Sequence, residues 1–296
     1  MTLNTDVKGD TFTVTTHEIP YPTIISRPNS LPSPFHVCII GASHDIGAYV
    51  AFSFAKAGAT AISICASAAE IEVSPIPSML RRYTRSTHLK FHLCDITIPS
   101  EVEAFASKIQ DEFGHVDVLV YTADYFGSEE TRVASTPHDF ATALEVNCNG
   151  LYLATHFMLP LLKKSPHGTG GAVIAISSDE MHATGGPGHD TAYSVSKLAQ
   201  CRYIEMLAAM EPDIFTAVVH PGDIESRMGR YNDPEGIRDD IPNDPYLCAD
   251  FILWLTKERR MWLSGRYLSS NWDVDELASR EADIVGQDKL KMRMVW

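Results

Sequence analysis

The sequence lacks several features that mark common classes of protein. Its six cysteines include no Cys-x-x-Cys pair, which argues against a zinc site or a disulfide framework and indicates a reduced, cytoplasmic protein. No segment approaches the roughly 18 apolar residues of a membrane span, and the polar N-terminus lacks the pattern of a secretory signal. The formal net charge of −14 argues against binding to nucleic acid or to an anionic membrane surface.

Proline is concentrated near the N-terminus, in a polar stretch that is also rich in threonine and serine. Five prolines lie between residues 20 and 34. We expect residues 1–35 to form an irregular extension that either wraps around the domain or stays mobile. The chain has 296 residues, of which 45% are hydrophobic, and this is enough to bury a large core.

From residue 36 onward, short apolar runs alternate with helical patterns. The runs predict strands buried on both faces at His36–Ile40, Thr60–Cys65, Leu89–Cys94, Val116–Thr122, Ala172–Ser177, Ile214–His220 and Tyr267–Ser269. Helices are predicted at 46–57, 99–113, 138–164 and 191–210. This spacing predicts one α/β domain over residues 36–285, doubly wound and Rossmann-type, with a parallel sheet of about seven strands and helices on both faces. A tail of residues 286–296 follows.

The first predicted strand runs directly into the segment Gly41-Ala42-Ser43-His44-Asp45-Ile46-Gly47, and a helix follows. Glycines at such a turn allow the backbone to approach a pyrophosphate, and the helix N-terminus favours its negative charge. An ordinary turn with two glycines is the alternative. Position 67, after the second strand, is serine where an NAD site has an acid. Ser67 therefore favours NADP(H) over NAD(H), and His44 either adds a cation or is a solvated loop histidine.

Tyr193 and Lys197 lie four residues apart, which places them one turn apart on the same face of a predicted helix. An ammonium beside a phenol favours the phenolate. We therefore expect Lys197 to lower the pKa of Tyr193 and to make it a proton donor or acceptor near neutral pH. The pair is a weak signal alone and depends on its context.

Several motifs in this order resemble the short-chain dehydrogenase/reductase family, over roughly Phe35 to Asp273. They are the glycine loop, Cys94-Asp95-Ile96-Thr97, Asn147-Cys148-Asn149-Gly150, Ser178, the Tyr193–Lys197 pair, and Pro221-Gly222. The segment from Gly265 to Leu277 resembles oxidoreductases of filamentous fungi, many of which belong to secondary metabolism.

The resemblance implies an NADP(H)-dependent oxidoreductase that transfers hydride between nicotinamide and a carbonyl or alcohol of a small organic substrate. It implies cofactor contacts from Gly41, Ser43, His44, Ile46, Gly47, Ser67, Asp95, Ile96, Ala123, Tyr193, Lys197, Pro221, Gly222, Ile224 and Ser226. Tyr193 would donate the proton, Ser178 would orient the carbonyl, and Lys197 would bind the nicotinamide ribose. Asn147 would hold a water that links Lys197 to solvent. Residues 223–246 would form a substrate lid, and the helices at 138–164 and 191–210 would form a homodimer or homotetramer.

The chain departs from the family pattern at four places. Asp45 replaces the middle glycine of the turn, and Ile40 replaces the preceding threonine. The family's Asn-Asn-Ala-Gly is Tyr121-Thr122-Ala123-Asp124, and the gap from the serine to the tyrosine is longer than usual. We expect Asp45 and Asp124 to weaken cofactor binding by repulsion, although Asp45 could instead cap the helix at a positive φ. We also expect an apolar contact to replace the family's polar link between strands one and four.

Several alternatives remain open at this level. Ser177 competes with Ser178 as the catalytic serine, and Asn147 could instead cap a helix kink. The same fold could also run an isomerisation, dehydration or cyclisation without net redox change. A non-catalytic protein that senses dinucleotides is the third reading.

Overall fold

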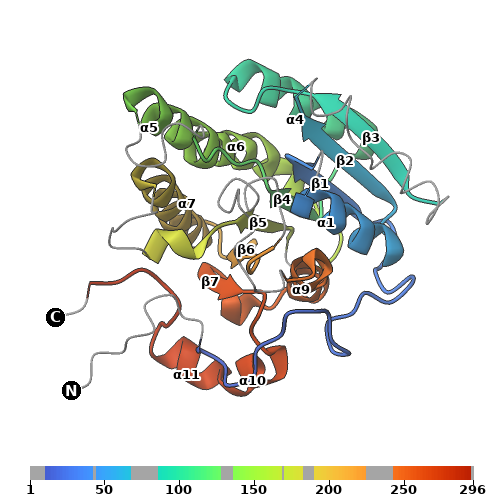
Figure 1. The fold of residues 1–296 in the computed structure, drawn as a ribbon. Helices are drawn as coiled ribbons and strands as arrows, with labels where there is room; N and C mark the ends of the chain where they lie inside the picture. Colours follow the sequence, from blue (N-terminus) through green and yellow to red (C-terminus); the bar gives the residue numbers. More distant parts are fainter. Residues whose placement is uncertain are drawn as a thin grey trace.

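A computed structural model describes residues 11–42, 45–67, 86–127, 136–168, 170–182, 190–224 and 243–294. Its centre is one seven-stranded parallel sheet in the order β3-β2-β1-β4-β5-β6-β7 (Figure 1). The strands are β1 (His36–Ile40), β2 (Ala61–Ala66), β3 (His88–Leu93), β4 (Val118–Tyr121), β5 (Ala172–Ile176), β6 (Phe215–His220) and β7 (Arg266–Ser269). The predicted doubly wound sheet is therefore confirmed.

Helices cover both faces of this sheet, as Figure 1 shows. The α-helices are α1 (Asp45–Lys56), α4 (Pro99–Phe113), α5 (Pro137–Ala143), α6 (Leu151–Leu162), α7 (Thr191–Met210), α9 (Pro245–Lys257), α10 (Val274–Ser279) and α11 (Glu281–Gly286). Short turns of other types are the π-helical η2 (Leu144–Gly150) and the 3-10 helices η3 (Asp179–His182) and η4 (Met261–Leu263). Every residue of β1, β2, β4, β5, β6 and β7 is buried, which explains why most of these strands are predominantly apolar.

Three helical regions differ from the prediction, namely residues 138–164, α9, and the short helices α10 and α11, where no helix is predicted. The helix predicted at 138–164 consists of α5, the π-helical turn η2 and α6. Helix α9 was missed, although Asp244 caps it through Tyr246 N and Pro245 occupies its first turn, which is a recognisable start signal. The predicted lid at 223–246 therefore ends inside α9, and its residues 225–242 lie outside the described residues.

The described part of the N-terminal extension wraps around the domain, which was one of the two predicted alternatives. It runs beside α10 before reaching β1 (Figure 1). Thr16 pairs with Trp272 in an antiparallel bridge. The hydroxyl of Tyr21 donates to Trp272 O at 3.2 Å and accepts from Val274 N at 2.9 Å. The extension is thus joined to the segment between β7 and α10.

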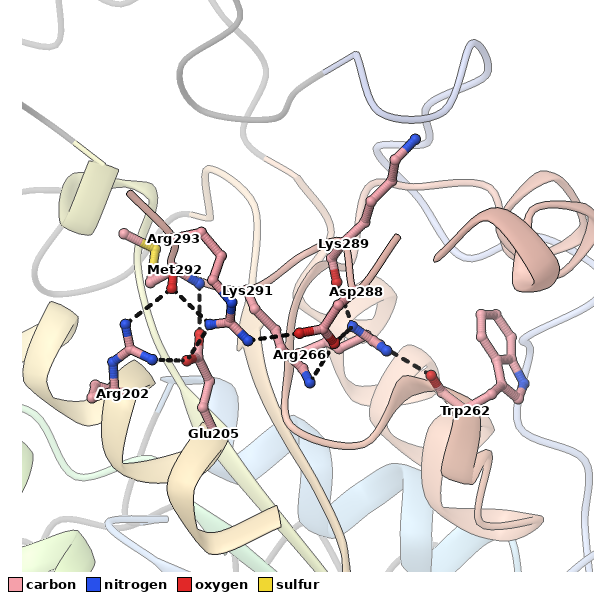
Figure 2. Close-up of polar contacts among 9 residues, drawn as sticks. All are labelled: Arg202, Glu205, Trp262, Arg266, Asp288, Lys289, Lys291, Met292 and Arg293. Carbon is pink, nitrogen blue, oxygen red and sulfur yellow. Dashed lines mark hydrogen bonds and ion pairs between the residues drawn. The ribbon is translucent and has the colours of Figure 1, made fainter. Parts of the chain in front are cut away.

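The C-terminal tail docks on α7 through charged contacts (Figure 2). Glu205 is nearly buried and accepts hydrogen bonds from Met292 N at 2.6 Å and Arg293 Nη1 at 3.2 Å. Asp288 pairs with Lys291 and Arg293. These cations, Lys291 foremost, lower the pKa of Asp288 to about 2.

All six cysteines are free thiols, and five of them are buried. Among the residues that the structure describes, no helix is both long and apolar enough to cross a bilayer. Over the same residues, no three His, Cys, Asp or Glu side chains form a group that could bind a metal ion.

His36 makes folding stability depend on pH. Its buried ring lies with Nδ1 3.0 Å from His115 O and Nε2 2.9 Å from Ser63 Oγ. A neutral ring satisfies both, because Nδ1–H donates to the carbonyl and Nε2 accepts from the hydroxyl. Burial lowers the pKa of His36 to about 4 from 6.5. Between these two values the unfolded chain binds a proton that the native state excludes, so stability falls as pH falls.

We expect this one group to cost about 3 kcal/mol of stability between pH 6.5 and 4. Urea unfolding at several pH values should show that His36→Gln lacks this part of the pH dependence. His138→Gln, at an exposed site, should keep it. An unchanged slope in His36→Gln would contradict the assignment.

Candidate active site

A cavity of about 430 Å³ opens at the carboxyl ends of β1 to β4. The strand order reverses between β1 and β4, and such switch points are where doubly wound sheets bind ligands. The volume is in the range of small-molecule sites. Its lining is Gly41, Cys65, Ala66, Ser67, Leu93, Cys94, Asp95, Ile96, Glu101, Ala123, Asp124 and Val146. The structure thus brings together five of the predicted cofactor residues, namely Gly41, Ser67, Asp95, Ile96 and Ala123.

The turn after β1 presses closely on the segment after β4. Gly41 has φ +86°, and a Cβ there would lie 2.5 Å from Ala123 N. Ile46 and Gly47 are buried in α1, and the predicted Ser43 and His44 lie outside the described residues. Asp45 begins α1 with φ 51°. It therefore has the positive φ that we expected if this residue starts the helix.

A local turn after the carboxyl end of β3 forms one side of the cavity. Asp95 Oδ1 accepts from Thr97 N at 2.9 Å and from Thr97 Oγ1 at 2.7 Å. Asp95 N donates to Glu101 Oε2 at 2.7 Å. Glu101 lines the cavity and was not among the predicted residues, because its position depends on how α4 begins.

The link between β1 and β4 is polar, so the expected apolar replacement is wrong. Thr122 N and Thr122 Oγ1 both donate to Ile40 O at 2.8 Å. Tyr121 is fully buried and donates to Val146 O at 2.5 Å. Thr122, the first residue after β4, therefore supplies the polar link between the two strands that the side chains of Ile40 and Tyr121 do not supply.

Tyr193 and Lys197 lie in the first two turns of α7, and both are almost completely buried. Asp190 caps the helix by accepting from Tyr193 N at 2.7 Å. Lys197 Nζ lies 5.3 Å from the centroid of the Tyr193 ring and donates to Ile176 O at 3.0 Å. The end of β5 and the start of α7 therefore hold the pair in place.

The two serines after β5 differ in their contacts. Ser177 is buried and donates to Met181 Sδ at 3.4 Å. Ser178 is partly exposed. Its hydroxyl accepts from Glu180 N at 3.2 Å and donates to Asp179 Oδ1 at 3.4 Å, and it lies close enough to Tyr193 to lower the pKa of that phenol. The geometry therefore associates Ser178, and not Ser177, with the tyrosine.

Asp124 joins the tyrosine to the lysine. Tyr193 Oη donates to Asp124 Oδ2 at 2.9 Å, and Lys197 Nζ lies 3.0 Å from Asp124 Oδ1. Burial raises the pKa of Tyr193 well above 10, and the Asp124 carboxylate raises it further, whereas the Ser178 hydrogen bond lowers it. The pKa of Tyr193 is therefore raised overall, and not lowered as expected, because burial and the Asp124 carboxylate disfavour the phenolate.

Asn147 lies in the π-helical turn η2 and is fully buried. Its Oδ1 accepts from Tyr125 N at 2.7 Å, and its Nδ2 donates to Tyr125 O and to Ser196 Oγ, both at 2.9 Å. Its carbonyl accepts from Gln200 Nε2 at 3.0 Å. The amide thus anchors the residue that follows Asp124, a contact that the sequence did not indicate.

The Pro-Gly turn follows β6, and Pro221 and Gly222 are both buried. Gly222 has φ +81°, and a Cβ there would lie 2.2 Å from Asn243 Oδ1. Ile224 forms a parallel bridge with Asn243, which also accepts from Asn271 Nδ2 at 2.7 Å. The turn is therefore held from the side of β7, and the predicted Ser226 lies outside the described residues.

Comparisons with known proteins agree with this fold and arrangement. The family model described as short chain dehydrogenase matches residues 35–235. The chain belongs to the short-chain dehydrogenase family, whose members are oxidoreductases that use a nicotinamide cofactor. The family resemblance inferred from the motifs is therefore confirmed.

Curated relatives in fungi match over nearly the whole chain. The short chain dehydrogenase mpl6 of Monascus purpureus is 33% identical, with 97% of each chain covered. The short chain dehydrogenase pgmD of Aspergillus terreus is 29% identical, covering 97% of this chain and 95% of the relative. These relatives match the predicted likeness to fungal enzymes.

Solved structures share the fold at lower identity. The RhlG/NADP active-site complex of Pseudomonas aeruginosa has a TM-score of 0.71 and 22% identity, covering 82% of this chain and 97% of that one. A short chain dehydrogenase of Shigella flexneri complexed with NADP has a TM-score of 0.71 and 20% identity, covering 82% and 99%.

Proposed function

We propose that the protein is an NADP(H)-dependent carbonyl reductase, or the reverse alcohol dehydrogenase, acting on a small organic molecule. The observation that carries the proposal is the convergence of Ser178, Tyr193 and Lys197 beside the cavity at the strand ends. Fungal relatives of similar length support a substrate from secondary metabolism. Neither the non-redox reactions nor the sensor role is favoured by a contact in the site.

The residues of the cavity fit the adenosine and phosphate half of a dinucleotide. The Gly41 turn and the start of α1 would hold the pyrophosphate, and Asp95 and Ile96 would hold the adenine. The nicotinamide, when bound, supplies or accepts a hydride at the substrate carbon. Asp124 also lines the cavity, and it pairs with Lys197, the residue that would bind the nicotinamide ribose.

The protein's own groups manage the oxygen of the substrate. Tyr193 donates its proton to the oxygen as negative charge develops there. Ser178 lies within reach of the same phenol and orients the carbonyl. Lys197, held by Ile176 O, supplies the positive charge that offsets the developing anion.

The cofactor choice follows from the end of β2. Ser67 lines the cavity where an NAD site would place a carboxylate, and a hydroxyl there can donate to a 2′-phosphate. The NADP complexes among the solved relatives are consistent with this choice.

Quenching of the four tryptophans provides a test of cofactor binding. We expect NADPH to bind about tenfold or more tightly than NADH, because the 2′-phosphate adds a charge-assisted hydrogen bond. Ser67→Asp should reverse this order, while Ser67→Ala should weaken NADPH without strengthening NADH. NADPH consumption is then followed by absorbance with a panel of aldehydes, ketones and diketones. Equal binding of both dinucleotides would contradict the cofactor choice, and no consumption with any compound would contradict the reaction.

A second part of the proposal is self-association through α5, α6 and α7. Large apolar side chains on these helices are exposed, namely Phe140, Tyr152, Val195, Leu198, Met206 and Met210. Exposed apolar surface of this kind is typical of an interface between subunits. We infer a homodimer or homotetramer that covers it.

A further inference from the structure

The proposed reaction requires that the proton of Tyr193 be replaced after each turnover. The route expected from the family passes through a water held by Asn147. Both atoms of the Asn147 amide are already bonded, to Tyr125 and Ser196, and its carbonyl accepts from Gln200. Both hydrogens of its amide are therefore used, and a water could bind here only through the remaining lone pair of an Asn147 oxygen.

Asp124 has the contacts that such a path requires. One carboxylate oxygen accepts from Tyr193 Oη at 2.9 Å, and the other lies 3.0 Å from Lys197 Nζ. Tyr193 and Lys197 are nearly sealed from solvent, whereas the Asp124 side chain is 19% exposed. It lines the cavity beside Ala123 and Val146. Within this group of three, the carboxylate is the member that reaches both the phenol and water.

We propose that Asp124 is a further catalytic residue, which carries protons directly between Tyr193 and solvent. This role rests on the proposed function. During carbonyl reduction, hydride forms the new C–H bond and the Tyr193 O–H bond breaks as its proton passes to the substrate oxygen. The Asp124 carboxyl, protonated from water, then gives its proton to the phenolate and returns to carboxylate. Alcohol oxidation runs the same transfers in reverse.

The charges around Tyr193 are consistent with this path. Lys197 faces both Asp124 and Tyr193, and its remaining described contact is the carbonyl of Ile176. Glu180 acts on Tyr193 through space only. Asp190 is bonded to Tyr193 N at the start of α7. Two further rings lie nearby without offering a route to solvent. Phe126 packs edge-on against Tyr193, and the buried Tyr121 donates to Val146 O.

The first test needs no substrate and uses the cofactor-free protein. Tyrosinate formation is followed by near-ultraviolet absorbance against pH, and the Tyr193 contribution is obtained by subtracting the matching Tyr193→Phe protein. We expect Asp124→Asn to let Tyr193 ionise at clearly lower pH, whereas Glu180→Gln, which removes a charge that acts on Tyr193 without a hydrogen bond to it, should shift it far less. An unchanged titration in Asp124→Asn would overturn the proposal.

The second test uses turnover with NADPH and the carbonyl compound that the wild-type protein reduces fastest. Asp124→Gly should lower kcat by about tenfold or more, and added formate should restore part of the rate in this variant but not in the wild type. Circular dichroism first establishes that the variant is folded. Turnover in Asp124→Gly equal to or above wild type, or the absence of rescue by formate, would overturn the proposal. If the wild type reduces no compound, the proposed function fails, while the titration still decides whether Asp124 controls the Tyr193 proton.

Discussion

Tyr193→Phe should lower the rate of carbonyl reduction by about 10²–10⁴-fold, the usual contribution of a positioned general acid. The variant lacks the hydroxyl that would donate to the substrate oxygen, and Ser178, which would orient this oxygen, offers no comparable proton. The loss should appear in kcat, because the removed interaction strengthens as charge develops on the oxygen. Steady-state kinetics with NADPH measures it directly.

The change should leave the fold and the cofactor cavity nearly unaltered. Phenylalanine keeps the edge-on contact with Phe126 and the backbone bond to Asp190. The Asp124 carboxylate loses one hydrogen bond but retains Lys197, so no buried charge is left unpaired. Quenching of tryptophan by NADPH should therefore remain close to wild type.

Tyr125→Phe is the matched control for loss of a phenol. The Tyr125 hydroxyl donates to Asp139 Oδ1 at 2.8 Å, whereas the Tyr193 hydroxyl donates to Asp124. Removal of the Tyr125 hydroxyl should change kcat only slightly. If Tyr193→Phe retained near-full turnover, another group would have to be the general acid. The roles proposed for Ser178 and Lys197 would then be contradicted as well.

The sheet was readable from the sequence because of where its strands lie. Strands covered by helices on both faces are mostly apolar, so β1, β2, β5 and β6 appear as short, predominantly apolar runs. The apolar pattern does not predict where the N-terminal extension packs. Its contacts, such as Tyr21 with Val274, join residues 253 positions apart, and no local pattern encodes such a pairing.

The site was predictable in part for a related reason. Tyr193 and Lys197 share one helix, so their spacing determines their proximity. Asp124 comes from the segment after β4 and meets Tyr193 across 69 positions. An aspartate where the family has glycine is the sign in the sequence that this position is unusual, and from charge alone it predicts repulsion of the cofactor. The sequence does not show that the Asp124 carboxylate points toward Tyr193 and Lys197.

The correction to the pKa of Tyr193 follows from this contact. An ammonium alone would favour the phenolate, but burial disfavours it most, and the Asp124 carboxylate, which accepts the phenolic hydrogen, disfavours it further. Sequence spacing showed the attractive partner and not the carboxylate between them. The prediction therefore identified the two residues correctly as neighbours, but it did not include burial and the carboxylate, which raise the pKa of Tyr193 overall.

Gly41→Ala should abolish measurable cofactor binding and destabilise the protein by roughly 2–5 kcal/mol. Gly41 has φ +86°, which costs a residue with a side chain about 1–3 kcal/mol. In addition, its Cβ would lie 2.5 Å from Ala123 N and 2.6 Å from Ala123 Cα. Because these are backbone atoms, no side-chain rotation relieves the overlap, and the turn must move away from the end of β4.

Gly114→Ala separates the two causes. Gly114 caps α4 with φ +76°, close to the value at Gly41, but a Cβ there meets no atom within 4 Å. This variant should lose only the conformational part, about 1–3 kcal/mol in urea unfolding, and should bind NADPH as the wild type does.

The difference between Gly41→Ala and Gly114→Ala therefore measures the effect of the close approach between the Gly41 turn and Ala123, because both variants share the cost of placing alanine at a positive φ. Movement of the Gly41 turn displaces the start of α1, where the pyrophosphate would bind, and it also pushes on Ala123, the neighbour of Asp124. Loss of NADPH quenching in Gly41→Ala alone would place the phosphate site at this turn. Equal losses of stability and binding in both variants would mean that the contact with Ala123 contributes nothing, and the cofactor would have to be sought elsewhere along the strand ends.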